Sequence, residues 1–511
     1  MSNALRLNEK DTVAVIPQHV NKGEEVVING TAEKYILQDD IPAGHKFALK
    51  DFKEGELIYK YGIPIAKAKV DITKGSWVHD HNVIDNTEEL CTKYINDYVN
   101  DEKTIDVFQR KNGKFGVANY ILLVPTSARA NIFAEKLANA TDSYWIVADK
   151  RQITTEDGLT KQARRTITFA PQNPNIYASV FIDAGEKKYK NIAQIIEKSG
   201  STIIYIDLDS DDEDKLFDET KNKIETWKEE ISRLKRVPHP IEGLKVSVHC
   251  GGSDWTTALA GNPALGVAAD HITQNGGYIF MDEWGGFPGS EHILVKQAAT
   301  RKLGLDIISK VNETRKWYID NYGKPVEEIN PYPCNKEGGI TTLVEKSTGN
   351  IKKAGSSTIQ AILEPGDEPT IPGVYLLNQD CLNPASTGSY GILSGAHINV
   401  FVTGVGYVYE EIPIIPDIRI TGNSESFKHK EFYLDFNAGT ALEDKTLATT
   451  GKDLFEFILS VASGGVKLRE EERKSHAFIM SYPKDDFFQP GEVSIDNFPE
   501  KHQEKVDAIK Q

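Results

Sequence analysis

Hydrophobic and polar residues alternate in short segments over the first part of the chain. Segments such as TVAVIP, EEVVIN, LIYKYG and WVHDHNV are separated by the turn signals NKGEE, IPAGH and FKEGE. An alternation with period two, interrupted by turns that contain glycine or proline, is typical of β-strands. The pattern therefore predicts a small all-β module over residues 1–88.

The hydrophobic pattern then fades over residues 89–115, which are polar, acidic and without a clear apolar face. We expect a linker there. From residue 116 the rhythm changes to strand, loop and helix, as in NYILLVPTSA followed by RANIFAEKLANA. After VPHPIEG the same rhythm restarts with LKVSVHCGGSD. Strands that alternate with helices of ten or more residues indicate parallel sheets. The sequence thus predicts two α/β units, over residues 116–240 and 241–511.

Three of the predicted strands end in unusual loops, over residues 249–254, 282–286 and 403–406. Ligands of open α/β sheets collect at the carboxyl ends of the strands. In the first loop, Ser253 or Asp254 is suited to cap the next helix, whose N–H groups suit a carboxylate. Gly251 and Gly252 would let a ligand approach the backbone. One such loop is what any strand-to-helix turn needs, but three on one edge favour a binding site that also includes Gly404.

Two further segments carry polar side chains among glycines. Asn335 and Lys336 lie in NPYPCNKEGGITTLVEKSTGN, where they are suited to bind carboxylates and hydroxyls. A desolvated lysine also serves as a general base. The segment NQDCLNPASTG supplies Thr387. A solvated helix start and an ordinary polar loop explain these segments equally well.

The β module contains a histidine pair, His79 and His81, separated by one residue, so on a strand both side chains would point to one face. His45 would reach the same place if its strand pairs nearby. Three histidines, or two with a carboxylate, suit a divalent metal or proton transfer. A hydrogen-bonded structural pair is the alternative.

Composition narrows the class of protein. The 511 residues suffice for about three domains. The net charge of −16 argues against non-specific nucleic-acid binding, which needs a basic surface. We find no apolar run long enough for a membrane span and no signal-peptide pattern. The four cysteines are widely spaced and form no CxxC pair, so we expect a reducing, cytoplasmic location.

Several motifs resemble one known family. IPAGHKFAL, GELIYKYGIPIAKA and WVHDHN look like the SAF (β-clip) domain of the altronate and galactarate dehydratases. CGGSDWTTALAGNPALG, NKEGGITTLVEKSTGNIKKAGSSTI, STGSYGILSGAHINVFVTGVG, PDIRITGN and DFNAGT are similar to the main domain of the same family, in the family's order. The resemblance implies a Rossmann-like parallel sheet in the C-terminal unit and a dimerisation role for the middle unit, hence a homodimer.

The resemblance also implies a function: a metal-dependent hydro-lyase, usually with Fe(II), that dehydrates a small anionic sugar acid to a 2-keto-3-deoxy acid through an enolate-like intermediate. Combining it with the residues above gives the expected site. The residues are catalytic Lys336, Ser253 and Asp254; substrate-binding Gly251, Gly252, Asn335, Thr387 and Gly404; and metal-binding His45, His79 and His81.

The chain departs from the family in the middle unit. GVANY has Ala118 where the family has arginine, and the cysteine expected after Pro125-Thr126 is absent. A His-x-x-Gly-Cys element is missing, and Asp183-Ala184-Gly185 replaces a Gly-Cys. Two alternatives therefore stay open: a carbon–sulfur lyase with the same enolate chemistry, such as a sulfo-lyase, and a catalytically silent paralogue that binds a sugar acid. An active enzyme should bring the three histidines within reach of residues 250–254.

Overall fold

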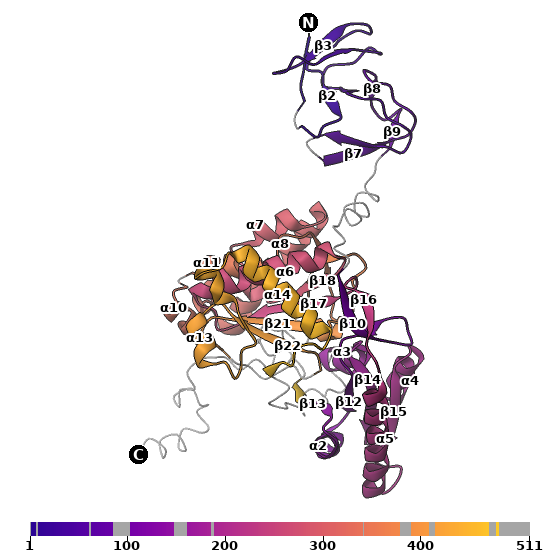
Figure 1. Ribbon diagram of the computed structural model, residues 1–511, viewed down its shortest axis with the longest axis vertical. Coiled ribbons are helices and arrows are strands. Elements are labelled where there is room, and N and C mark those ends of the chain that lie inside the picture. The colour runs from indigo at the N-terminus through magenta and orange to yellow at the C-terminus, as the bar shows by residue number, and fades with distance from the viewer. Residues whose placement is uncertain are drawn as a thin grey trace. The chain divides into compact units, whose positions relative to one another are not determined.

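The computed structural model describes residues 2–6, 9–60, 63–84, 103–147, 161–184, 189–340, 342–378, 390–407, 414–469 and 477–479. The chain divides into two compact units, residues 1–98 and residues 99–511. We describe each unit by itself (Figure 1). No helix among the described residues is long and apolar enough to cross a membrane.

The first unit is all-β, as the alternating pattern predicts. Among its described residues, nine strands form three small sheets, with orders β1-β3-β4, β2-β5-β8 and β6-β7-β9. The strands are β1 Ser2–Ala4, β2 Val13–Val15, β3 Glu25–Ile28, β4 Lys34–Ile36, β5 Lys46–Ala48, β6 Leu57–Lys60, β7 Ile63–Ala68, β8 Trp77–Val78 and β9 Val83–Ile84. In β3, Val26 and Ile28 are buried while Glu25 and Val27 are partly exposed, which shows the period-two pattern directly.

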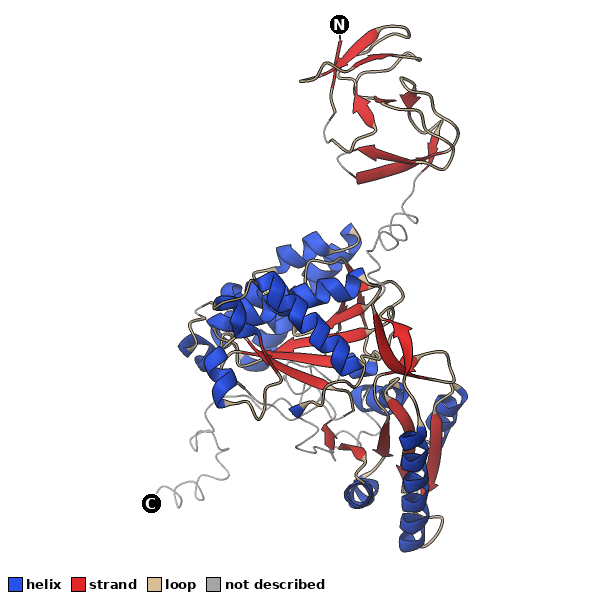
Figure 2. Ribbon diagram, viewed as in Figure 1, coloured by secondary structure: helices blue, strands red, loops and turns tan. Residues whose placement is uncertain are grey.

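The described part of the second unit forms two parallel sheets and a small antiparallel one (Figure 2). The five-stranded parallel sheet has the order β15-β14-β12-β13-β24. Its strands are β12 Tyr120–Pro125, β13 Tyr144–Val147, β14 Ile176–Asp183, β15 Thr202–Asp207 and β24 Ala477–Ile479. Its helices are α2 Ala128–Thr141, α3 Lys161–Phe169, α4 Lys190–Lys198 and α5 Glu213–Arg233. The strand β24 joins this sheet from the far end of the chain, although the sequence places it in the C-terminal unit.

The small sheet corrects the expected linker. Strand β10 (Thr104–Gln109) lies inside residues 89–115, strand β11 (Phe115–Gly116) begins at their last residue, and the two strands pair with each other. Strand β10 also pairs with β16 (Val237–Pro240), the segment expected to form the boundary between the two α/β units. In β10, Ile105 and Val107 are buried against the main core, so its two apolar residues at alternate positions outweigh its polar composition.

The larger parallel sheet has the order β19-β20-β18-β17-β21-β22-β23. Its strands are β17 Lys245–Cys250, β18 Tyr278–Met281, β19 Ile359–Leu363, β20 Gly373–Leu377, β21 Ile398–Thr403, β22 Asp417–Thr421 and β23 Phe436–Asn437. The chain runs from β17 to β18, then to the edge strand β19 and back to β20 between them, and then crosses to β21 on the other side of β17. The strand order therefore reverses between β17 and β21, which is the doubly wound, Rossmann-like arrangement that the resemblance implies.

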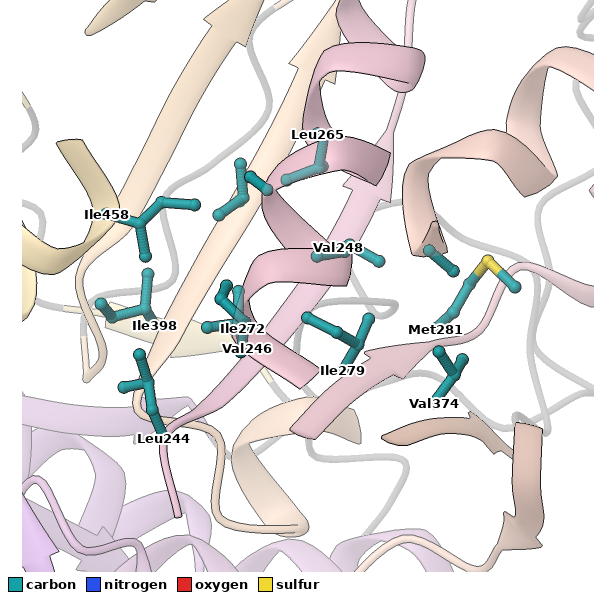
Figure 3. Close-up of a cluster of buried hydrophobic side chains, with 14 of the residues drawn as sticks. Leu244, Val246, Val248, Leu265, Ile272, Ile279, Met281, Val374, Ile398 and Ile458 are labelled. Atoms are coloured by element: carbon teal, nitrogen blue, oxygen red, sulfur yellow. The ribbon is translucent and has the colours of Figure 1, made fainter. Parts of the chain in front are cut away.

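Helices cover one face of this sheet. They are α6 Asn262–Gln274, α7 Glu291–Gln297, α8 Arg301–Tyr322, α9 Val326–Ile329, α10 Pro333–Glu337, α11 Leu343–Ile351, α13 Ser424–His429 and α14 Leu447–Ala462. In α6, Leu265, Ala268 and Ile272 recur at helical spacing and face the strands. Figure 3 shows Leu265 and Ile272 over Val248 and Ile279, in the apolar layer that anchors the strand ends described below.

The other face of the sheet packs against the five-stranded sheet. Phe280 and Phe401 of the larger sheet share one buried cluster with Leu122 and Val124 of the smaller one. Because this core is continuous, the two predicted α/β units form one compact body.

Candidate functional site at the carboxyl edge of the large sheet

The loop after β17 begins the site at the point where the strand order reverses. Asp254 is buried, and its Oδ1 accepts hydrogen bonds from the N–H groups of Thr256 and Thr257, at 2.9 and 3.0 Å. These are the donors that the sequence analysis assigned to a substrate carboxylate. They are already paired with the chain's own carboxylate, so Asp254 acts here as a cap for the helical segment that follows.

The glycines of this edge are explained by close packing rather than by open space. A Cβ on Gly251 would lie 2.7 Å from Phe401 Cζ, and one on Gly404 would collide with the Asp254 carboxylate. Gly252 has φ +58° and lies against Tyr407. The three glycines thus let the loops after β17 and β21 meet, and their N–H and C=O groups pair, as Gly404 N with Gly252 O at 3.1 Å.

A charged cluster lies beneath the same loop. Lys353 has no exposed surface, and its Nζ is an ion-pair partner of Glu283 and donates to Asn350 Oδ1. The same Nζ is 3.5 Å from Cys250 Sγ, which donates to Asn350 Oδ1 at 3.1 Å. Cys250 ends β17, Glu283 follows β18, Asn350 lies near the end of α11, and Lys353 lies in the turn that directly follows α11. Groups from three parts of the chain therefore meet around the thiol.

Glu283 is held in an unusual backbone conformation. Its φ is +68°, in the left-handed region that non-glycine residues seldom adopt. Such strain, of order 1–3 kcal/mol, is concentrated at functional sites. Its side chain is 15% exposed, so the carboxylate reaches between the buried Lys353 and the surface.

A second lysine, Lys346 on α11, lies in the same region. Its Nζ donates to Asn330 Oδ1 at 2.6 Å and to Asn335 Oδ1 at 2.8 Å. Asn335 in turn donates from Nδ2 to Ser253 O at 2.9 Å, so α10 and α11 are both tied to the loop after β17. Ser253 is buried beside Cys250, with its Oγ 3.8 Å from the thiol.

The surroundings separate the pKa values of the two lysines. Burial alone would lower the pKa of Lys353, but Cys250 and Glu283 outweigh it, so its pKa is raised. Burial lowers the pKa of Lys346, and the nearby ammonium of Lys353 acts in the same direction. Burial also raises the pKa of the Cys250 thiol, against the effect of Lys353. Titratable groups whose pKa values are pushed apart at one site are typical of acid–base catalysis.

A polar row lies deeper in the sheet. The Oγ of Ser247 is 2.8 Å from His249 Nε2, and His249 Nδ1 is 3.0 Å from the buried carboxylate of Asp282. Burial raises the pKa of Asp282, while His249 opposes the rise. These side chains lie inside the sheet, which agrees with a structural role for His249.

The expected site residues are thus placed as follows. Gly251, Gly252, Ser253, Asp254, Asn335 and Gly404 come together at the carboxyl edge of the large sheet. Lys336 is on α10 with an exposed side chain, whereas Lys346 is the lysine that reaches Asn335. Thr387 lies outside the described residues.

Lys353, Glu283 and Asn350 were missed as site residues by sequence reasoning. The loop DEWGG was noted only as a strand end, and NIKKAG reads as the solvated end of a helix. The one usable signal was the position of Glu283 two residues after a buried strand, on the same edge as Cys250. Nothing in the local pattern distinguishes Lys353, which is buried, from Lys352, which is exposed.

His45, His79 and His81 of the first unit gather around Trp77. His79 and His81 lie in the turn after the two-residue strand β8, not on one strand as expected, and His45 directly precedes β5. The His45 and His79 ring centroids are 4.9 Å apart, and Trp77 Nε1 donates to His45 Nδ1 at 3.2 Å. One ligand atom from each of His79, Asp80 and His81 lies within 4.8 Å of the others. Two imidazoles and a carboxylate have the composition of a ferrous site.

In the described part of the chain, the carboxyl edge of the five-stranded sheet carries a single buried carboxylate instead of the lysine and thiol cluster of the large sheet. Asp183 accepts hydrogen bonds from the Tyr205 hydroxyl at 2.7 Å, the Thr126 hydroxyl at 3.2 Å and the Ala184 N–H at 2.8 Å. This buried carboxylate stands where the sequence resemblance led us to expect a Gly-Cys. It is paired with its own chain on both oxygens.

Family models match the chain in three consecutive stretches. The altronate/galactarate dehydratase SAF domain matches residues 2–86. The second domain of D-galactarate dehydratase/altronate hydrolase matches residues 107–232, and the C-terminal domain of D-galactarate/altronate dehydratase matches residues 241–484. The chain belongs to the altronate and galactarate dehydratase family. The named dehydratases are hydro-lyases, which confirms the predicted enzyme class.

Individual relatives are similar over most of their length. Altronate dehydratase of Escherichia coli is 28% identical and aligns over 90% of this chain and 95% of its own. Galactarate dehydratase (L-threo-forming) of E. coli is 27% identical over 93% of this chain and 98% of its own. The beta subunit of (2R)-sulfolactate sulfo-lyase from Chromohalobacter salexigens is 24% identical over 70% of this chain and 92% of its own.

Proposed function

We propose that this protein is a metal-dependent hydro-lyase that converts a sugar acid of the altronate or galactarate type to a 2-keto-3-deoxy acid. The observation that carries the proposal is the end-to-end similarity to altronate dehydratase, across all three matched domains. The buried lysines, thiol and strained glutamate at the carboxyl edge support it, because the chemistry needs a base and a positive charge near a carboxylate.

The metal-binding proposal rests on the histidine turn of the first unit. The donor set of His79, Asp80 and His81, with His45 beside it, fits a divalent cation such as Fe(II). A divalent cation supplies Lewis-acid stabilisation of a carboxylate or of a leaving hydroxyl. The Asn82 side chain holds the turn, since it donates to Trp77 O at 2.8 Å and accepts from His79 N–H at 3.0 Å.

At the carboxyl edge the chain supplies the remaining groups. The Lys353–Glu283 pair holds charge at a fixed place, and Asn335 keeps the Ser253 loop in position. The substrate is a small anion, and we propose that a homodimer in the cytoplasm carries out the reaction. The dimer is tested by sedimentation velocity and the location by fractionation of cells that express the protein.

The decisive experiment is a dehydration assay. Purified protein is incubated anaerobically with ferrous iron and a panel of aldonic and aldaric acids that includes altronate and galactarate, and 2-keto-3-deoxy products are measured. We expect turnover of at least one acid and its loss on chelation. No turnover by folded, iron-loaded protein with any acid would refute the proposal.

Metal binding is tested separately from turnover. His79→Ala should lower the iron content after desalting, measured by inductively coupled plasma mass spectrometry. His19→Ala is the matched control, because His19 is an exposed histidine of the same unit that contacts Asn21. Equal iron in both variants would remove the histidine turn as the metal site.

A second candidate function is carbon–sulfur lyase activity, favoured by the similarity to the sulfolactate sulfo-lyase beta subunit. Both reactions begin with removal of the proton next to a carboxylate and differ in the leaving group. Incubation with sulfolactate and detection of sulfite distinguishes them. Failure of both assays would leave the silent, acid-binding paralogue, which equilibrium binding of altronate would then test.

A further inference from the structure

Two lysines lie near Cys250, and only one of them has access to a bound molecule. Lys353 exposes no surface and is enclosed by Glu283, Asn350 and Cys250. Lys346 is only partly buried, on the face of α11 that meets the loop after β17. A group that reacts with substrate must touch it, so Lys346 is the lysine to consider.

The geometry around Lys346 fixes two of its three N–H directions. Asn330 donates from Nδ2 to Gly285 O at 3.0 Å, and Asn335 donates from Nδ2 to Ser253 O at 2.9 Å. Because each amide nitrogen faces a carbonyl, each amide oxygen must face Lys346 Nζ. Both asparagines are buried, so the amine is held relative to the ends of β17 and β18. The third bond direction on Lys346 Nζ, which holds an N–H in the ammonium form or the lone pair in the amine, points away from both amide oxygens.

Four titratable groups act on the charge of Lys346. Cys250, Glu283 and Cys334 favour its charged form, and Lys353 disfavours it. The ring of Tyr332 lies 5.1 Å from Nζ. Burial outweighs the favourable groups, so the pKa of Lys346 is lowered. Neutral amide oxygens are the acceptors that touch Nζ, and they accept hydrogen bonds from an amine as well as from an ammonium group.

We propose that Lys346 is the base that removes the proton on the carbon next to the substrate carboxylate, an inference that rests on the proposed dehydratase function. The Nζ lone pair takes the proton, and the C–H electron pair moves into the carboxylate to give an enediolate. That electron pair then forms the carbon–carbon double bond as the β C–O bond breaks. The hydroxyl leaves as water with the proton that Lys346 Nζ took from the α-carbon, delivered directly or through solvent, so the amine is regenerated and no other reactant is needed. The enol becomes the 2-keto acid.

The first test measures the amine itself. Competitive acetylation of the intact protein over a range of pH, read by mass spectrometry, gives the pKa of each labelled lysine. We expect Lys346 to titrate below the ordinary lysine value of ~10.4. Altronate or galactarate should slow its labelling at least severalfold, while Lys352, exposed on the same segment, is unaffected. An ordinary pKa, or labelling unaffected by either acid, overturns the proposal whether or not the protein shows activity.

The second test isolates proton removal from loss of water. A 3-deoxyaldonic acid has the α-proton but no β-hydroxyl to lose, so the enzyme should exchange that proton with D2O, followed by proton NMR. We expect Lys346→Gln to slow the exchange about 10²–10⁴-fold. Lys346→Arg should not restore it, because arginine stays charged. Lys352→Gln is the matched control and should exchange at the wild-type rate.

The outcomes separate the two proposals. Exchange and turnover that persist in folded Lys346→Gln refute Lys346 as the base and leave the dehydratase function standing. Restoration by Lys346→Arg would show that the residue supplies charge, not a base, and also refutes the proposal. If wild-type protein neither dehydrates any acid nor exchanges its α-proton, the proposed function is refuted. The labelling experiment then tests the lowered pKa and the substrate contact of Lys346 independently of activity. Folding of each variant is checked by urea unfolding.

Discussion

The two ends of the large parallel sheet both bury titratable side chains, but they use them differently. At the amino end, His397 directly precedes β21, accepts from Lys245 N–H at 3.0 Å and bonds to Phe115 O at 3.0 Å. Its ring stacks on Phe115 with centroids 4.5 Å apart. At the carboxyl end, Lys353 and Glu283 pair as charges, and Lys346 keeps part of its surface.

The difference shows that a perturbed pKa by itself does not mark a functional site. Burial lowers the pKa of His397 to about 3, and burial also lowers the pKa of Lys245. Yet both ring nitrogens of His397 bond to the chain's own backbone, which joins β11 to β17 and β21. At the carboxyl end the perturbed groups accompany a residue at positive φ and an accessible amine. The strained residue and the accessible amine, rather than the pKa shifts alone, distinguish the carboxyl end from the amino end.

The largest expected effect comes from removing the buried cation of the carboxyl end. Lys353→Met removes the ammonium group that pairs with the Glu283 carboxylate and should lower the free energy of unfolding by roughly 3–5 kcal/mol. Urea unfolding measures the change. Lys352→Met, its exposed neighbour, should stay within about 0.5 kcal/mol of wild type. A Lys353→Met protein as stable as this control would show that the pair does not hold the site together.

The contribution of the amino end to the unfolding free energy should depend on pH. The folded pKa of His397 is lowered to about 3, whereas its ordinary value is 6.5, so the unfolded chain binds the extra proton first. Stability from this group is present above pH 6.5 and is lost as pH falls toward 3. Between pH 7 and pH 5 the loss should be about 2 kcal/mol, at 1.36 kcal/mol per pH unit.

The variant His397→Gln keeps one donor and one acceptor but does not titrate. Its unfolding free energy, measured at both pH values, should therefore fall by about 2 kcal/mol less than that of wild type. The difference in slope is the readout, since the substitution also changes packing at pH 7. Parallel slopes would mean that His397 is accessible to protons in the folded state, and the contrast between the ends would weaken.

A smaller effect tests the role of Asp254 at the carboxyl end. Because its Oδ1 caps the N–H groups of Thr256 and Thr257, Asp254→Ala should cost about 1–2 kcal/mol in unfolding free energy. Asp254→Ser retains a capping oxygen and should cost less. Loss of turnover in both variants with unchanged stability would instead support the catalytic role that the sequence suggested.

The smallest effect is expected at Lys336. Its side chain is exposed on α10, so Lys336→Gln should change stability by less than about 0.5 kcal/mol. Turnover by Lys336→Gln, compared with Lys346→Gln in the same dehydration assay, decides between the lysine chosen from sequence and the one chosen from structure. A larger loss in Lys336→Gln would restore the original assignment.

Much of the architecture was predictable because it depends on local periodicity. The alternation in the first unit and the strand–helix rhythm after residue 116 led to the observed fold classes. The predictions failed where a partner distant in sequence decides the outcome. Strand β10 has a polar composition and reads as a linker until β16 pairs with it, and β24 joins a sheet whose other strands lie more than two hundred residues earlier.

The sequence indicated where the candidate site lies in the fold but not which groups its residues contact. The loop at residues 249–254 was singled out because glycines and capping residues cluster there, and the structure confirms that Gly251, Gly252, Ser253 and Asp254 lie at the switch point. Their contacts, however, are with the chain itself. Whether a helix N-terminus is open to a ligand depends on the rotamer of one carboxylate, which sequence does not specify.

The sequence by itself determined the order of elements, the glycine-rich strand ends and the family to which the chain belongs. Only the tertiary structure decided which lysines are buried and what they face. Glu283 and Lys353 are 70 residues apart, and Cys250 is 103 residues from the same amine. Burial and the pKa of a side chain depend on neighbours in space, and a local pattern of residues contains no information about which distant segments supply them.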